Sequence, residues 1–435
     1  MTGRRFVVEQ IFRSADIGAS IPVLRYPTLG VVAWIGSRMA WVEQSGNNSW
    51  RVRYRRDDGT IGAINGFATK TAAGDHAGTL ESDQRQGRWI DPAAGKTTVA
   101  EWTQDWLGAL DVAIRTEDYY RSLLRRHILP RWGDHGLADI SGIKAAVWAK
   151  QLRADGYAQA TVSGVTKLLS LLLADAVEER LIVANPIRAR RRGRHRATRR
   201  VERIWATPEE ALAVADNAAR LPGAGPGAAV LIVTAAWTGA RWGELVGLQR
   251  CNTHLDDGVI VVDPDIGTLH ESSRGLELGP PKTAESARTI ALPAFLVGLL
   301  QAHLDGHDHR HVFVSPEGEL HRRSNFGRRA MRPAADGNQA RTRPEVRLAV
   351  VKTGLTFHGL RHSHKTWMIA DGVPEIAQAR RLGHILDDKI QQTYSHVAAE
   401  VDARLLEGLA DRWAKAVADS PDNSAWRSPS GVAAS

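Results

Sequence analysis

Cysteine is almost absent from this sequence, since Cys251 is the only one among 435 residues. A single cysteine excludes an internal disulfide and any zinc module built on clustered thiolates. The chain also lacks a long apolar run: its longest one, Ala228–Trp237, is about half of the roughly 20 residues that a membrane span needs. The N-terminus has no signal-peptide core. We therefore expect a protein of the reducing cytoplasm with no membrane partner.

Acidic residues are too few to balance the basic ones. The chain has 57 Lys and Arg against 48 Asp and Glu, a formal net charge of +9. Such a surplus attracts polyanions, which means nucleic acid or an anionic membrane surface. Lysine is scarce among the basic residues, and the guanidinium of arginine fits phosphate better. GC-rich codons would also enrich arginine, so only clustered arginines indicate binding.

The length predicts several domains rather than one. Residues 1–40 show no period and stay unassigned. Residues 41–90 predict a small domain in which strands near 50–54 and 60–67 form a hairpin, followed by a helix from 69 to 86. Arg51, Arg53 and Arg55 would share one strand face. That face could enter a DNA groove or could be a solvated basic surface, and these residues alone favour neither.

Residues 97–187 predict at least three packed helices. Thr98 and Glu101 form a capping-box pattern at a helix start. Apolar side chains then recur at helical spacing from 120 to 128, where Pro130 is expected to stop the helix, and from 165 to 176.

Residues 188–203 predict a linker, because they offer almost nothing to bury. Eight arginines lie between 188 and 200. A solvated hinge is the plain alternative, but a flexible polycation in a basic protein is expected to follow a DNA backbone. The expected DNA-binding residues here are Arg188, Arg190, Arg191, Arg192 and Arg194.

Residues 204–418 predict a mixed α/β domain, and residues 419–435 a disordered tail. Helices are expected near 208–220 and 228–238, short strands at 259–262, 267–269 and 287–292, and helices again from 357 to 417. Within this domain, Arg241 in the string TGARWGEL follows a helix-breaking glycine at a new helix start. Lys282 in PKTAESART is the only lysine between positions 167 and 352. A lysine retained among so many arginines suggests a proton donor, although chance also explains it.

Histidines and a tyrosine complete the set of candidate site residues. His358 and Arg361 in HGLRHSH are three residues apart, so both can meet one anion at a helix start. His384 follows in RLGH, and Tyr394 in TYSHV lies ten residues further on. A phenol with an ordinary pKa near 10 becomes a nucleophile only beside groups that take its proton and neutralise its target. No HExxH pattern or carboxylate set accompanies the histidines, so we expect no metal site and no cofactor.

The order Arg, Lys, His-x-x-Arg, His, Tyr resembles the signature of tyrosine recombinases, the family of phage integrases. All six positions occur in family order between Arg241 and Tyr394. The resemblance implies a multidomain, mainly α fold with small β-sheets. A helical core-binding domain and a mixed α/β tyrosine-recombinase catalytic domain would follow a small N-terminal hairpin-and-helix domain that binds arm-type sites.

The resemblance also implies a mechanism. Tyr394 would attack a DNA phosphodiester and form a 3′-phosphotyrosyl link. Arg241 and Arg361 would clamp the phosphate, His358 and His384 would donate hydrogen bonds or move protons, and Lys282 would protonate the departing 5′-oxygen. Neither ATP nor metal is needed.

The family further implies partners. These are double-stranded DNA attachment sites and three more copies in a homotetramer on DNA, and an excision or directionality factor could act with them. The protein would integrate and excise a phage or mobile element in the bacterial cytoplasm, at the nucleoid. Two rivals remain: a type IB topoisomerase, which would relax DNA as a monomer, and a DNA-binding regulator that has lost catalysis.

Overall fold

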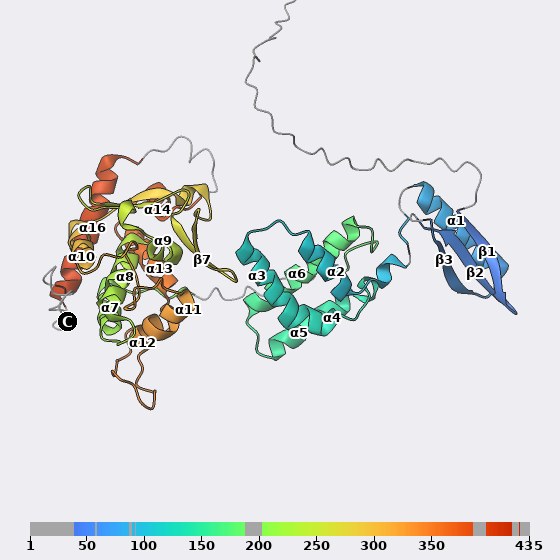
Figure 1. The fold of residues 1–435 in the computed structure, drawn as a ribbon, viewed down its shortest axis with the longest axis horizontal. Helices are drawn as coiled ribbons and strands as arrows, with labels where there is room; N and C mark the ends of the chain where they lie inside the picture. The colour runs from blue at the N-terminus through green and yellow to red at the C-terminus, as the bar shows by residue number, and fades with distance from the viewer. Residues whose placement is uncertain are drawn as a thin grey trace, which may run out of the picture. The chain divides into compact units, whose positions relative to one another are not determined.

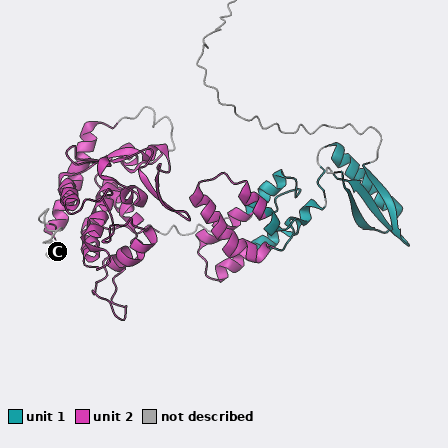
Figure 2. Ribbon diagram, in the orientation of Figure 1, with its two compact units in different colours: residues 1–102, 134–146, 170–187 teal, residues 103–133, 147–169, 188–435 magenta. Residues whose placement is uncertain are grey.

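The computed structural model describes residues 39–56, 59–86, 89–91, 93–187, 202–385, 397–419 and 426 (Figure 1). Two compact units make up the chain, and each is described here by itself (Figure 2). The first unit comprises residues 1–102, 134–146 and 170–187, and the second comprises residues 103–133, 147–169 and 188–435. The helical region 97–187 contributes to both units, so its extent as one domain stays a prediction.

The N-terminal part of the first unit is an antiparallel sheet covered by one helix. The strands β1 (Ala40–Gly46), β2 (Ser49–Arg55) and β3 (Ile61–Phe67) pair in that order, and α1 (Lys70–Arg85) follows. Val52 and Tyr54 point from β2 into a core that includes Ala73 and Leu80 on α1. The predicted hairpin and helix are confirmed, and β1 is an additional strand.

This additional strand changes the charge of the predicted basic face. Arg51 lies opposite Glu43 of β1, and its Nε donates to the Glu43 carboxylate at 2.9 Å. Arg53 approaches the same carboxylate at 3.6 Å. Glu43 therefore offsets part of the positive charge that alternation along β2 places on this face. DNA binding by Arg51, Arg53 and Arg55 stays a prediction.

The helical region contains α2 (Val99–Gly108), α3 (Ile114–Leu123), a π-turn η2 (Leu124–Ile128), α4 (Leu129–Trp132), α5 (Gly142–Ala154) and α6 (Gln159–Glu178). The capping box is present, since Glu101 accepts from the Thr98 backbone at 2.8 Å and donates its own N–H to the Thr98 hydroxyl at 3.2 Å. The expectation that Pro130 stops the helix is wrong. The π-turn precedes Pro130, and its shifted hydrogen bonds accommodate a residue without an N–H.

Helix α6 has the length and apolar composition of a membrane span. However, Val165, Leu169, Leu172 and Leu173 are fully buried against protein. This is the pattern of a core helix.

The second unit contains a large mixed domain built around α8 (Gly225–Thr238). Every side chain from Ala228 to Thr238 is buried. The other α-helices that the structure describes in this domain are α7 (Pro208–Ala219), α9 (Trp242–Val246), α10 (Ala294–Asp305), α11 (Arg323–Phe326), α12 (Arg332–Asp336), α13 (Phe357–Ala370), α14 (Glu375–Leu382) and α16 (Ala399–Ala418). One sheet has the order β4 (Thr253–His254), β5 (Val259–Val262), β8 (Arg288–Ala291), and β6 (Thr268–Ser272) pairs with β7 (Gly275–Gly279). The predicted helices and strands are confirmed where the structure describes them, and α10, α11, α12, β4 and β7 are additional.

Helix α16 is held on the domain by tryptophans. Trp413 stacks on Phe295 with ring centroids 4.1 Å apart, and Trp237 Nε1 donates to the Leu409 carbonyl at 3.0 Å. Trp426 packs edge-on against Trp413, donates to the Asp216 carboxylate and is 4% exposed. The expectation of a disordered tail is therefore wrong for Trp426, because an indole ring here buries a large apolar surface.

Candidate active site

Two glycines bring the chain segments of the candidate site close together. Gly239 ends α8 with φ +65°, and a side chain there would meet the ring of His364 at 2.8 Å. Gly383 ends α14 with φ +62°, and a side chain there would lie 3.0 Å from the carbonyl of Glu285. Only glycine adopts this conformation at such close approach without strain. The end of α8 therefore lies directly against His364, and the end of α14 lies directly against Glu285.

Arg241 is fixed at the start of α9 by side chains and backbone. It is the N-cap residue, and its N–H donates to the Glu244 carboxylate at 2.8 Å, as the capping pattern predicts. One terminal nitrogen of Arg241 donates to Glu244 at 2.7 Å and to the Ser286 hydroxyl at 2.9 Å. The other donates to the Gly383 carbonyl at 2.8 Å. The guanidinium is thus held in one orientation while staying partly exposed.

Arg361 lies beside it on α13 and is buried, with 4% exposure. It donates to the Gly239 carbonyl at 2.6 Å and to the Leu382 carbonyl at 2.5 Å. Its contact with His384 Nε2 is 2.8 Å. Burial, followed by the charge on Arg241, lowers the pKa of Arg361 to about 9. Such crowding of cations raises the affinity of this place for an anion.

Two further arginines, Arg288 and Arg381, belong to the same hydrogen-bond network as this pair. Arg288 donates to the Glu244 carboxylate at 3.0 Å and to the Arg381 carbonyl at 2.7 Å. Arg381 is held by the Trp237 carbonyl at 3.1 Å and by His364 Nε2 at 2.9 Å. The carboxylate of Glu244, 2% exposed, thus faces two cations. Burial alone would raise its pKa, but Arg288 and Arg241 lower it below the usual value.

The histidines of the site are neutral near pH 7. Although part of each ring is exposed, burial of the rest, followed by neighbouring groups, lowers the pKa of His358 and of His384 to about 4. The neighbours are chiefly His362 for His358 and Arg361 for His384. Because a guanidinium can only donate, Nε2 of His384 accepts and Nδ1 carries the proton. His384 therefore keeps one N–H donor for a ligand.

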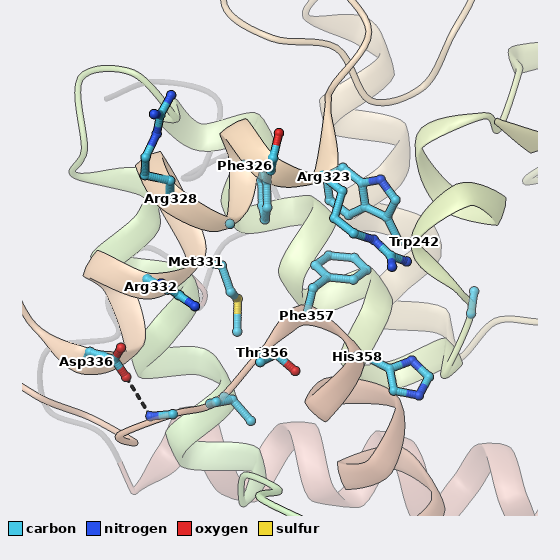
Figure 3. A pocket seen from close by; sticks show the side chains of 15 residues that line it. Trp242, Arg323, Phe326, Arg328, Met331, Arg332, Asp336, Thr356, Phe357 and His358 are labelled. Atoms are coloured by element: carbon cyan, nitrogen blue, oxygen red, sulfur yellow. Dashed lines mark hydrogen bonds between the residues drawn. The ribbon is translucent and has the colours of Figure 1, made fainter. Parts of the chain in front are cut away.

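Aromatic side chains connect α9, which follows Arg241, to α13, which carries His358 and Arg361. Trp242, which follows Arg241, packs against Phe357, which precedes His358, with ring centroids 4.9 Å apart. A cavity of about 660 Å³ opens beside this pair, and Figure 3 shows His358 at its edge with Arg323 nearby. Edge-to-face aromatic packing fixes the relative position of α9 and α13.

The structure brings Arg241, Arg361 and His384 together, as the sequence predicts. His358 lies at the surface on α13, and its ring centroid is 4.8 Å from that of His362. Lys282 is exposed between β7 and β8, next to Thr283, whose hydroxyl is 3.1 Å from that of Ser286. Tyr394 and the predicted DNA-binding residues Arg188, Arg190, Arg191, Arg192 and Arg194 lie outside the described residues.

Sequence reasoning missed Ser286, which accepts from Arg241, and the role of Glu244 between two arginines. It also missed Arg288, Arg381 and His364, which extend this hydrogen-bond network. The only available signal was their place inside the strings PKTAESART, HGLRHSH and RLGH. Among the described residues, no group of three His, Cys, Asp or Glu is arranged to hold a metal ion.

Residues 199–400 match the profile of the phage integrase family, and this range contains all six predicted catalytic positions. The chain carries a phage integrase domain. For residues 199–400, the family that the resemblance predicts is confirmed. The integrase domain extends from just before α7 to the start of α16, so it includes every residue of the site described above.

Sequence similarity to known integrases extends beyond the integrase domain. The integrase of prophage phiRv2 in Mycobacterium tuberculosis is 28% identical over 390 residues, which cover 85% of this chain and 95% of that protein. The integrase of Mycobacterium phage L5 is 28% identical over 331 residues, 75% of this chain and 82% of that protein. The similarity therefore includes much of the region that precedes the integrase domain.

Solved structures share the fold. The Tn1549 transposon integrase in complex with a circular intermediate DNA has a TM-score of 0.56 at 18% identity, covering 72% of this chain and 99% of that chain. A lambda integrase tetramer bound to a Holliday junction has a TM-score of 0.50 at 18% identity, covering 82% of this chain and 98% of that chain. The predicted fold class, mainly α with small β-sheets, is confirmed.

Removing the charge of Glu244 should destabilise the integrase domain. Glu244→Gln leaves Arg288, whose side chain is 7% exposed, without its carboxylate partner. Breaking a buried ion pair from one side costs about 3 kcal/mol of unfolding free energy. The control is Glu285→Gln at an exposed position, for which about 0.5 kcal/mol or less is expected. Urea unfolding measures both, and equal losses would contradict the role of Glu244.

Acid should destabilise the protein through buried neutral histidines. His364 is fully buried, and burial, followed by the charge on Arg381, holds its pKa well below the usual 6.5. The unfolded state therefore binds the proton more tightly, so this stability is complete above about pH 6.5 and falls as the pH drops further. We expect thermal midpoints that are flat from pH 7 to 8 and lower at pH 5. His364→Gln should fall less steeply, and an equally steep fall would contradict this origin.

Proposed function

We propose that this protein is a site-specific DNA recombinase that integrates and excises a phage or another mobile element. The observation that carries the proposal is the pair Arg241 and Arg361, held by backbone carbonyls so that both guanidinium groups converge beside His384. Such a pair suits the non-bridging oxygens of one phosphodiester.

Each site residue then has a role in strand cleavage. Tyr394 attacks the phosphorus and forms a 3′-phosphotyrosyl bond, and the 5′-oxygen leaves with a proton from Lys282. Arg241 and Arg361 neutralise the charge that builds on the phosphate, and His384 and His358 donate hydrogen bonds or move protons. Donors fixed in advance lower such a barrier by roughly 3 kcal/mol each. Both Arg241 and Arg361 are fixed in this way.

The reverse reaction rejoins DNA. A 5′-hydroxyl attacks the phosphotyrosyl bond, the phosphodiester forms again and the tyrosine leaves. Because the two esters have similar energy, neither ATP nor a metal ion is required. This proposal is supported by the positive charge that the chain itself supplies: Arg288 and Arg381 lie in the same network as the two proposed phosphate-binding arginines.

The proposed partners are DNA attachment sites and further copies of the chain. The related lambda integrase is described as a tetramer on a Holliday junction, and the Tn1549 integrase is bound to a circular intermediate DNA. We propose the same kind of assembly here, in the bacterial cytoplasm, with an excision factor that sets direction. The segment Arg188–Arg200 would follow the DNA backbone.

A nicked suicide duplex tests the function. The duplex carries the attachment sequence recovered from the ends of the element that contains the gene, and a nick lets the cleaved 5′-fragment diffuse away. We expect a covalent protein–DNA complex on this duplex and none on a scrambled one. Covalent complexes on every duplex would instead indicate a topoisomerase, and binding without any covalent complex would indicate a regulator.

A further inference from the structure

A second concentration of positive charge lies on the integrase domain outside the site described above. Residues 328–347 contain six arginines but only two acidic residues, Asp336 and Glu345. All six arginines are exposed, and none forms an ion pair with another described residue. We call this set the arginine face; it consists of Arg328, Arg329, Arg332, Arg341, Arg343 and Arg347.

The loop that carries half of the arginine face is anchored at its base. Asn338, which is 6% exposed, accepts from the Leu348 N–H at 2.8 Å and donates to the Val346 carbonyl at 2.6 Å. One side chain therefore closes the loop at its base, although the residues between are exposed. Asp336 accepts from the Gly354 N–H at 2.6 Å, so it serves the backbone rather than an arginine. The loop presents its arginines without neutralising them.

These arginines border a groove. Arg328 and Arg329 on η6 (Gly327–Met331), and Arg341 and Arg343 on the loop, line an open cavity of about 610 Å³. Glu345 is the one carboxylate among its lining residues. Four guanidinium groups against one carboxylate make a groove that suits a chain of phosphates, because each fork can grip an anionic oxygen.

The arginine face is continuous with the catalytic site. Arg328 and Arg332 also line the cavity beside His358, together with Arg323 (Figure 3). Arg328 thus borders both cavities. A track of exposed arginines therefore runs from the edge of the catalytic site, at His358, to the loop.

We propose that the arginine face binds the phosphate backbone of the same DNA duplex that the catalytic arginines engage, outside the cleavage position. The proposal rests on the function proposed above, because continuity with a phosphate-handling site is what selects DNA over an acidic protein. The face lengthens the footprint on DNA and contributes affinity rather than catalysis. It carries no sequence preference, since backbone contacts position a protein without reading bases.

The test compares two double variants of the full chain that each remove two exposed positive charges. Arg341→Gln/Arg343→Gln alters the arginine face, and Arg404→Gln/Lys415→Gln alters α16 as a matched control. Fluorescence anisotropy with a 40-bp duplex of random sequence, titrated at several KCl concentrations, gives affinity and salt dependence. Removing one interaction with a phosphate reduces the slope of log K against log salt by about 0.9. We expect the first variant to show a slope smaller by about 2 units and to bind roughly 30-fold more weakly at 0.15 M salt.

The control variant should keep the wild-type slope, and both variants should melt at the wild-type temperature. Equal slopes for wild type and Arg341→Gln/Arg343→Gln would overturn the proposal, and an acidic protein would then be the better partner. At saturating protein, the variant should still form covalent complexes on the nicked attachment-site duplex. A wild-type protein that forms none, while the slope difference persists, would overturn the recombinase function and still support the arginine face as a DNA-binding surface.

Discussion

Tyr394→Phe is expected to bind attachment-site DNA as tightly as the wild-type protein and to form no covalent complex. Only the phenolic hydroxyl is removed, so the basic surfaces that attract DNA are unchanged. Removing a nucleophile lowers the rate of its step by more than about 10³-fold. Denaturing gel electrophoresis of the nicked duplex reports the covalent product, and anisotropy reports binding.

Tyr157→Phe is the matched control, because this tyrosine is exposed and removing its hydroxyl leaves the edge-on contact of its ring with His127. It should cleave at the wild-type rate. Covalent product from Tyr394→Phe would mean that another side chain is the nucleophile, and the assignment of Tyr394 would fail.

Arg361→Lys is expected to lower the rate of covalent complex formation by about 10²- to 10³-fold. Lysine keeps the charge, but its ammonium is a single point and cannot replace a planar fork. The carbonyls of Gly239 and Leu382 would no longer both have a donor. Single-turnover cleavage at saturating protein separates this loss from weaker DNA binding.

The matched control is Arg380→Lys on α14, two residues before Leu382, where the side chain is exposed. It should keep the wild-type rate. If Arg361→Lys also cleaved at that rate, a positive charge alone would suffice, and the proposed fork-like grip on the phosphate would be wrong.

The sequence was sufficient to predict most elements of the integrase domain, because their signals are local. The capping residues Thr207 and Glu210 mark the start of α7, and Gly239 marks the end of α8. The strand β1 was missed although Gly46, Asn47 and Asn48 supply a turn between it and β2. Pro130 misled because a proline signals a helix end only where no π-turn precedes it.

The candidate site was predicted as a set of residue types but not as a network. The sequence order indicates that Arg241, Arg361 and His384 belong together. It does not indicate that Glu244 on α9 also faces Arg288 on β8, or that Arg381 on α14 reaches His364 on α13, because these contacts depend on tertiary packing between segments far apart in the sequence. The arginines between 328 and 347 are as visible in the sequence as those of the linker, but only the structure shows that four of them line one groove.

The hydrogen bonds of Arg241 and Arg361 explain why lysine could not replace either arginine. A guanidinium has five N–H donors, and the two together use six of their ten on this chain: Glu244, Ser286, Gly383, Gly239, Leu382 and His384. An ammonium has three, so a lysine pair would exhaust its whole supply on holding the protein in shape. The remaining N–H donors of the two arginines would be available to an incoming phosphate. Both arginines can therefore hold the protein structure and bind a phosphate at the same time.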